Sequence, residues 1–235
     1  MMIRTIGYLY KQFGYNLKIV FAGKFAWFMI AALAVFLFII FEIAWNHQDV
    51  TEYSVIYMFM LFPSILLIFY PTVFGIQNDR DSRILELIFG IPDYRYKVWG
   101  LRLAMFFVVV HLITVLFIIL AGILLAPVPV YRIALQLLFP ILFYGNFAFM
   151  FSAITRSGNG TATLFIIFAL LPLFFGNMIE NTMWDPYLNP FKNPDGMHPV
   201  IWASTILKNR LFLSISAVIF LMTGLLKLQD REKFL

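Results

Sequence analysis

Asp79 and Asp81 form a close pair of carboxylates, and such a pair can serve acid–base chemistry when its two groups hold protons with different affinity. A membrane enzyme such as a lipid-headgroup transferase would need further acids or a catalytic dyad beside them, and no such group joins the pair. The three histidines, His47, His111 and His198, are far apart and match no metal-binding pattern. The chain also has no cysteine and no GxSxG serine motif. The sequence therefore predicts neither a catalytic residue nor a metal site.

Residues 157–161, SGNGT, have the glycine content of a phosphate-binding loop. A P-loop needs a lysine after its second glycine and a strand-to-helix setting, and both are missing here. The segment is predicted to be a tight turn between two helices instead. The formal net charge of +5 could indicate nucleic acid, but the basic residues follow the membrane topology described below. No nucleic-acid partner is predicted.

Four polar side chains stand inside apolar stretches, where they are costly and therefore candidates for function. His111 falls near the middle of a predicted span, where it could line a path or titrate as substrate passes. Tyr144 and Asn146 lie in the middle of another span, and Glu42 lies near the outer end of the first. These four are the candidates for a substrate path. The alternative is that they only hydrogen-bond to neighbouring helices or reach the interface.

The composition places these residues in a membrane. The chain has 235 residues, of which 62% are hydrophobic and 12% are charged, whereas soluble domains carry about 25% charged residues. A helix needs about 20 apolar residues to cross the hydrocarbon core. Segments close to this length are the predicted spans 25–45, 53–76, 101–126, 133–155, 161–179 and 211–227. The predicted fold class is an all-α integral membrane protein with six transmembrane helices in a single transmembrane domain, residues 1–235.

The positive charges predict an orientation, because basic flanks stay on the cytoplasmic side. With a cytoplasmic N-terminus, thirteen of the 17 lysines and arginines lie in cytoplasmic segments. The remaining four, on the outside, are Arg132, Lys192, Lys208 and Arg210. Both termini are therefore predicted to lie in the cytoplasm.

Two segments outside the spans have patterns of their own. Residues 1–23 repeat apolar positions at spacings of three and four, with basic residues on the other side, which is typical of an interfacial helix on lipid headgroups. The alternative is an extension of the first span. Residues 180–210 are rich in proline and are predicted to form an irregular outer loop. Within it, 200–207 is apolar but too short to span, so it is predicted to be a re-entrant or surface helix.

The insert, residues 79–92, separates the second and third spans. A helix starting near Asp79 would hold Asp79 and Asp81 in its first turn, where acids favour the helix dipole. Arg83 would then be spaced to pair with Asp79. One apolar side would be formed by Ile84, Leu85, Ile88 and Phe89, and the sequence GIP at 90–92 would end the helix. The pattern predicts a short amphipathic helix on the cytoplasmic face of the membrane. The alternative is a loop anchored by its charges.

The insert also resembles a known family. The run DRDSRILELI at 79–88, followed by an Ile-Pro at 91–92, Arg95 and Gly100, is similar to the acid-Arg-acid, Leu-Glu, Pro and Arg signature of ABC-2 type transporter permeases. The resemblance extends to the six-span plan, the N-terminal interfacial helix, the polar turn after span four and an Asn-Pro-Phe at 189–191. The family more often has Gly-Thr where this chain has Arg83-Ile84.

In those permeases the insert is a coupling helix that docks on an ATP-hydrolysing subunit. The resemblance implies that ATP and Mg²⁺ bind to a separate ABC ATPase chain, and that this chain is a transport subunit rather than an enzyme. It also implies a second six-helix permease unit, a path lined by spans one, two and five, and a place among membrane lipids of the bacterial cytoplasmic (inner) membrane. The expected ATPase-coupling residues are Asp79, Arg80, Asp81, Arg83, Leu85, Glu86 and Phe89.

The sequence thus favours the permease subunit of an ATP-driven exporter for a lipidic, amphipathic, peptide or glycan substrate. Two other classes stay open. A polytopic membrane enzyme would need more than one acid pair. A channel or scaffold without an ATPase partner would have no use for the amphipathic insert.

Overall fold

The structure is a computed structural model, and it describes residues 25–45, 53–90 and 93–229. Within these ranges every regular element is a helix. The elements in chain order are α2 (Phe25–Trp45), α3 (Tyr53–Asp81), α4 (Ile84–Phe89), the π-helix η1 (Arg95–Gly100), α5 (Leu101–Leu124), α6 (Val130–Thr155), α7 (Gly158–Phe174), α8 (Gly176–Ile179) and α9 (Pro199–Lys227). The predicted interfacial helix at 1–23 lies outside the described residues.

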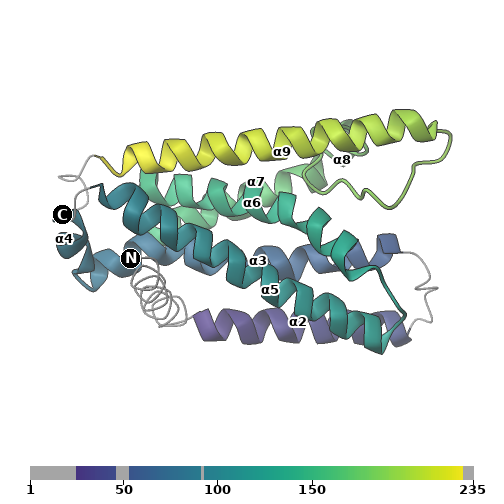
Figure 1. The fold of residues 1–235 in the computed structure, drawn as a ribbon, viewed down its shortest axis with the longest axis horizontal. Helices are drawn as coiled ribbons and strands as arrows, with labels where there is room; N and C mark the ends of the chain where they lie inside the picture. Colours follow the sequence, from purple (N-terminus) through teal and green to yellow (C-terminus); the bar gives the residue numbers. More distant parts are fainter. Residues whose placement is uncertain (1–24, 46–52, 91–92, 230–235) are drawn as a thin grey trace, which may run out of the picture.

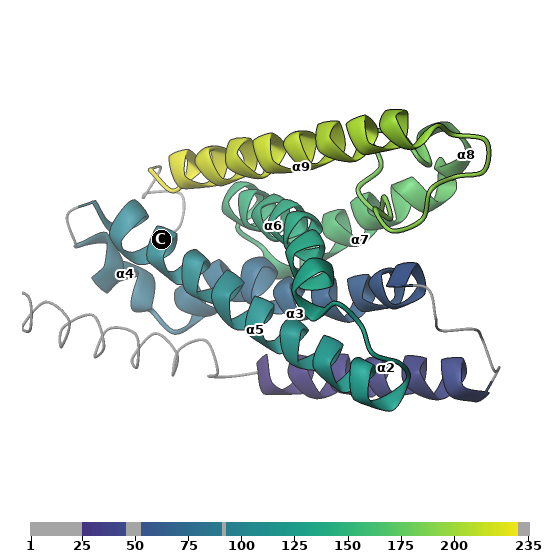
Figure 2. The same cartoon turned by 45° about the vertical axis from the view of Figure 1, so that its right-hand side comes forward.

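The long helices run back and forth between two ends of a bundle (Figure 1). One end carries α4, and α2 begins and α9 finishes on that side; we call it the insert end (Figures 1 and 2). The other end carries α8 and the connection 180–198, and we call it the loop end. Helix α6 is central, because it packs against α3, α5, α7 and α9.

Five of the described helices are long and apolar enough to cross a membrane. They are α2, α3, η1 with α5, α6 and α9, which agrees with the predicted all-α membrane protein. The predicted span 161–179 is divided in the structure, because α7 ends at Phe174 after 17 residues and α8 is a separate short helix. Pro172 lies in the last turn of α7, where a proline favours the end of a helix. The number of six spans therefore stays a prediction.

Helix α9 is longer than the sequence pattern indicates. It begins at Pro199 and takes in residues 200–207, so this stretch is neither re-entrant nor a separate surface helix. The His198 side chain caps it, with Nδ1 accepting from the Val200 N–H at 3.3 Å. Lys208, Asn209 and Arg210 interrupt the hydropathy, but no glycine or proline occurs between Val200 and Gly224, so nothing breaks the helix there.

Small and polar side chains bring the central helices together. A side chain at Gly145 in α6 would overlap Phe107 of α5 and Ile68 of α3, so only glycine allows this approach. The Ser152 hydroxyl donates to the Val73 carbonyl of α3 at 2.9 Å. Aromatic rings fill the space between α6, α7 and α9. The result is a tightly packed centre made by α3 and α6.

Candidate functional site

The insert is divided in the structure, unlike the single predicted helix. Asp79, Arg80 and Asp81 form the last turn of α3, and a new helix, α4, begins at Ile84. Arg83 has a backbone φ of 56°, a left-handed conformation that ends a right-handed helix. The acids at 79 and 81 therefore lie at the C-terminal end of α3 and not in the first turn of the following helix.

Asp79 pairs with Arg102 of α5 rather than with Arg83. The Arg102 guanidinium donates to an Asp79 carboxylate oxygen, and the two residues are only 5% and 3% exposed. The Trp99 ring stacks on the same guanidinium, with its centroid 4.8 Å from Cζ. This ion pair fixes the end of α3 to the start of α5, so Asp79 is not available at the surface.

The end of α3 also holds the turn between α6 and α7. The Arg80 guanidinium donates to the Arg156 carbonyl at 3.0 Å, and the Gly158 N–H donates to Oε1 of Gln77. A methyl group on Gly158 would overlap the Phe74 ring and the Gln77 amide. The Ser157 side chain caps α7 by accepting from the Gly160 N–H at 3.3 Å. Ser157 is thus the N-cap of α7 and residues 158–161 are its first helical turn, so the connection between α6 and α7 is shorter than the predicted turn.

The segment after α4 reaches the end of α9. The Tyr94 hydroxyl, which is buried, donates to the Leu228 carbonyl just beyond α9. Trp99 is buried in η1, with its ring 6.2 Å from that of Phe149 in α6. Gln77, Asp79 and Arg80 thus connect the end of α3 to α5 and to the turn before α7, while Tyr94 and Trp99 connect the segment after α4 to α9 and α6.

The predicted coupling residues lie in different surroundings. Leu85 and Ile88 of α4 are buried against the bundle, whereas Ile84 and Glu86 are exposed. Arg80, Asp81 and Arg83 are exposed as well, and the Arg80 and Asp81 side chains lie 3.6 Å apart. The Phe89 side chain lies outside the described part. Of the predicted coupling residues, Arg80, Asp81, Arg83 and Glu86 are therefore available to another protein, while Asp79 and Leu85 face inward.

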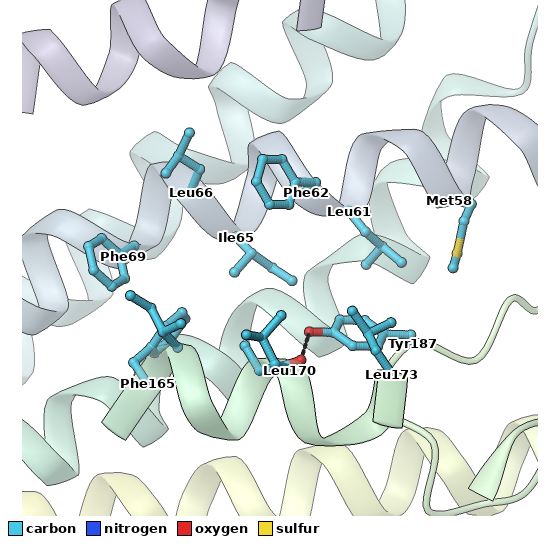
Figure 3. Close-up of a pocket in the computed structure, with 12 residues that line it drawn as sticks. Met58, Leu61, Phe62, Ile65, Leu66, Phe69, Phe165, Leu170, Leu173 and Tyr187 are labelled. Carbon is cyan, nitrogen blue, oxygen red and sulfur yellow. Dashed lines mark hydrogen bonds between the residues drawn. The ribbon is translucent and has the colours of Figure 1, made fainter. Parts of the chain in front are cut away.

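A second feature is an apolar cavity of about 410 Å³ between α3 and α7 (Figure 3). Its walls include Phe62, Ile65 and Phe69 from α3, and Phe165 and Leu170 from α7. Tyr187, from the connection between α8 and α9, also lines it. The Tyr187 hydroxyl donates to the Ala169 carbonyl at 2.7 Å, which is the dashed line in Figure 3.

Beside the cavity lies a polar mouth of about 650 Å³ at the loop end. Met58, Leu173 and Tyr187 line both spaces, so the two lie side by side. The polar side chains of the mouth are Ser54, Glu180, Asn181, Asp185, Asn189 and Lys192. We call the cavity and its mouth together the groove.

Two neighbouring residues of α9 hold the outer connection in place. The buried Arg210 guanidinium donates to Gln136 of α6 at 2.7 Å, to Asn209 at 2.8 Å, and to the Tyr57 hydroxyl and the Leu188 carbonyl at 3.3 Å. The Asn209 amide donates to the carbonyls of Met183 and Asp185. The mouth of the groove is therefore anchored to α3, α6 and α9.

Asp185 lies in this anchored connection, outside the spans. Burial raises the pKa of its carboxyl, while the backbone N–H groups of Tyr187 and Asn181 oppose the rise. The Tyr187 N–H donates to Oδ1 at 2.8 Å. A buried acid thus stands at the mouth of the groove.

The four predicted path residues do not line the groove as the structure describes it. Tyr144 is buried behind its wall, with its ring stacked on Tyr187 at 5.7 Å. Asn146 is buried in α6 and donates to the Leu142 carbonyl at 2.9 Å. His111 is half-buried in α5, and Glu42 is exposed on α2. Tyr187 and the groove carried no signal in the sequence, because phenylalanine, leucine and isoleucine also cover lipid-facing helices.

Comparison of the chain with family models, with curated proteins and with solved structures finds no match.

Proposed function

We propose that this chain is the permease subunit of an ATP-driven transporter of the ABC-2 type. In this proposal a separate ABC ATPase chain binds ATP and Mg²⁺, and a second six-helix unit completes the transporter. Both termini lie on the cytoplasmic side of a bacterial membrane, which places the insert end in the cytoplasm. The multi-pass helical bundle is the framework that such a subunit needs.

The observation that carries the proposal is the construction of the insert end. Helix α4 buries Leu85 and Ile88 and leaves Glu86 exposed, next to the exposed Arg80, Asp81 and Arg83. The residues on either side of α4 are bonded to other helices, because Gln77 and Asp79 at the end of α3 bond to the turn before α7 and to α5, and Tyr94 after α4 bonds to the end of α9. A push on α4 would therefore move several helices together, which is what a coupling element must do.

The groove adds a second line of support. It is formed by α3 and α7, which correspond to the second and fifth predicted spans, and it consists of an apolar cavity and a polar mouth beside it. The resemblance to ABC-2 permeases implies a path along these spans. The insert end and the groove share α3 and α7, so movement at one can change the other.

The enzyme alternative depended on the acid pair at 79 and 81. Asp79 is held in a buried ion pair with Arg102, and Asp81 is exposed on the other side of the turn beside Arg80. The two carboxylates are therefore not placed to share one substrate. Within the described residues, no group of three His, Cys, Asp or Glu side chains could hold a metal ion.

The test is a charge reversal on the exposed side of α4. An ATP-hydrolysing chain should co-purify with the wild-type protein, and Glu86→Arg should reduce both co-purification and the stimulation of ATP hydrolysis without affecting membrane insertion. Asp195→Arg is the matched control, because Asp195 is an exposed acid at the loop end. Absence of a co-purifying ATPase, or equal loss in the two variants, would contradict the proposal.

A further inference from the structure

We propose that the groove between α3 and α7 binds one hydrocarbon chain of a membrane phospholipid, with the headgroup in the polar mouth. The proposal deepens the proposed function, because it names the class of substrate for the same site, and its transport part rests on that function. The binding itself can be tested on this chain alone.

The cavity wall offers no free polar group to a ligand. Its lining side chains are aliphatic or aromatic, apart from the Tyr187 hydroxyl, which already donates to the Ala169 carbonyl at 2.7 Å. A peptide, a glycan or an ion would leave its own polar groups without partners here. A hydrocarbon chain has no such groups and gains from burial.

The length of the apolar cavity matches the thickness of the hydrocarbon layer of one leaflet. The lining residues run from Met58 to Phe69 on α3 and from Phe165 to Leu173 on α7, which corresponds to about 12–17 Å at a rise of 1.5 Å per residue. Half of a hydrocarbon core of about 30 Å has the same depth. The apolar cavity therefore accommodates a hydrocarbon chain that starts at the loop-end surface and ends near the middle of the membrane.

The mouth has the charges that a phospholipid headgroup needs. Glu180 and Lys192 are both exposed and line the same space, so an ammonium and a phosphate can each find an opposite charge. The mouth lies at the end of the cavity where Met58, Leu173 and Tyr187 line both spaces. A molecule with an apolar chain and a charged head fits both parts at once.

The groove is open toward the bilayer. Phe62 and Leu173 line the cavity and are 61% and 64% exposed, so the two walls do not close over it. A lipid can therefore enter sideways from its leaflet without passing through the bundle.

The experiment uses the purified chain, without an ATPase, in nanodiscs of phosphatidylcholine that contain a phosphatidylethanolamine with a diazirine in one acyl chain. After illumination, adducts are mapped by mass spectrometry. We expect them to concentrate on the α3 and α7 residues that line the cavity. Adducts spread evenly over all exposed helices would overturn the proposal.

Two variants sharpen the test. Ala169→Phe adds a ring to the cavity wall without changing the backbone carbonyl that accepts from the Tyr187 hydroxyl. The ring should displace about two methylene groups of the lipid chain and so weaken labelling about tenfold. Ala203→Phe adds the same ring on the exposed side of α9, away from the groove, and should leave labelling unchanged. Equal labelling in both variants would count against the site.

Two further outcomes separate this inference from the proposed function. If a cysteine at position 62 cross-links to a second copy and lipid labelling is absent, the groove is an interface between copies and the lipid site is wrong. If lipid labels the groove but no ATPase co-purifies, the site stands and the transporter proposal fails. If an ATPase-driven transport activity survives unchanged in Ala169→Phe, the function stands and the groove is not its substrate site.

Discussion

Asp79 and Arg102 face each other across the interface of α3 and α5 and form an ion pair that is closed off from water. The Trp99 ring covers the guanidinium on one side. The pair joins the last turn of α3 to the first turn of α5, and α4 and η1 lie between these two turns in the chain. The pair therefore ties together the two long helices that precede and follow α4 in the chain.

Asp79→Ala should lower the free energy of unfolding by about 3–5 kcal/mol, because it leaves a buried guanidinium without its counter-charge. Thermal or denaturant unfolding of the purified protein measures this loss. Asp81→Ala is the control, since Asp81 is exposed, and it should change stability by less than about 0.5 kcal/mol. The double variant Asp79→Leu with Arg102→Met should recover much of the loss, because no charge is then left buried. Equal losses in the two single variants would contradict the importance of the pair.

Gly158→Ala should separate α7 from α3 at the insert end. The added methyl group would overlap the Phe74 ring and the Gln77 amide, and overpacking of this kind costs about 1–3 kcal/mol. The change in separation can be measured between spin labels on the two helices. Gly160→Ala is the matched control, because its methyl group would lie 3.6 Å from the nearest atom, on Ser157. An unchanged α3–α7 distance in Gly158→Ala would show that this contact does not set the spacing.

The sequence predicts the long helices because a segment must have a high mean hydropathy to be stable in lipid. It misses the true length of α9, where Lys208, Asn209 and Arg210 interrupt the apolar run but not the helix. Those polar residues are tolerated because Asn209 and Arg210 turn inward and bond to Gln136 and the outer connection. A one-dimensional pattern cannot show that a polar residue near a span has a partner elsewhere.

The site was only partly predictable for a related reason. The exposed charges of the insert follow from its local pattern, and Arg80, Asp81, Arg83 and Glu86 are indeed exposed. The partner of Asp79 does not follow, because Arg102 lies 23 residues away, far outside the range of helical pairs. The groove is less predictable still, since its lining uses the same residue types as any lipid-facing helix.

Arg210→Lys should loosen the outer connection. A lysine cannot reproduce the planar set of donors that reaches Gln136, Asn209, Tyr57 and the Leu188 carbonyl. We expect a loss of at least about 2 kcal/mol, since each bond to a charged donor contributes about 1.5–3 kcal/mol. Limited proteolysis within 180–198 should become faster. Lys208→Ala, on an exposed neighbouring position, should leave the proteolysis rate as it is; a similar increase there would show that general loosening of α9 is responsible.

Asp185→Asn should change how stability depends on pH. Burial raises the pKa of the Asp185 carboxyl in the folded protein, so the folded state binds this proton more tightly than the unfolded state. Stability then falls as the pH rises above the unfolded pKa of about 3.9 and through the higher folded pKa. Asparagine cannot ionise, and its side-chain oxygen can still accept from the Tyr187 N–H. The variant should therefore gain stability relative to the wild type between about pH 4 and pH 7, measured by thermal unfolding at both values. Asp195→Asn, at an exposed position of the same connection, should show no such gain, and a gain of equal size there would refute the assignment to Asp185.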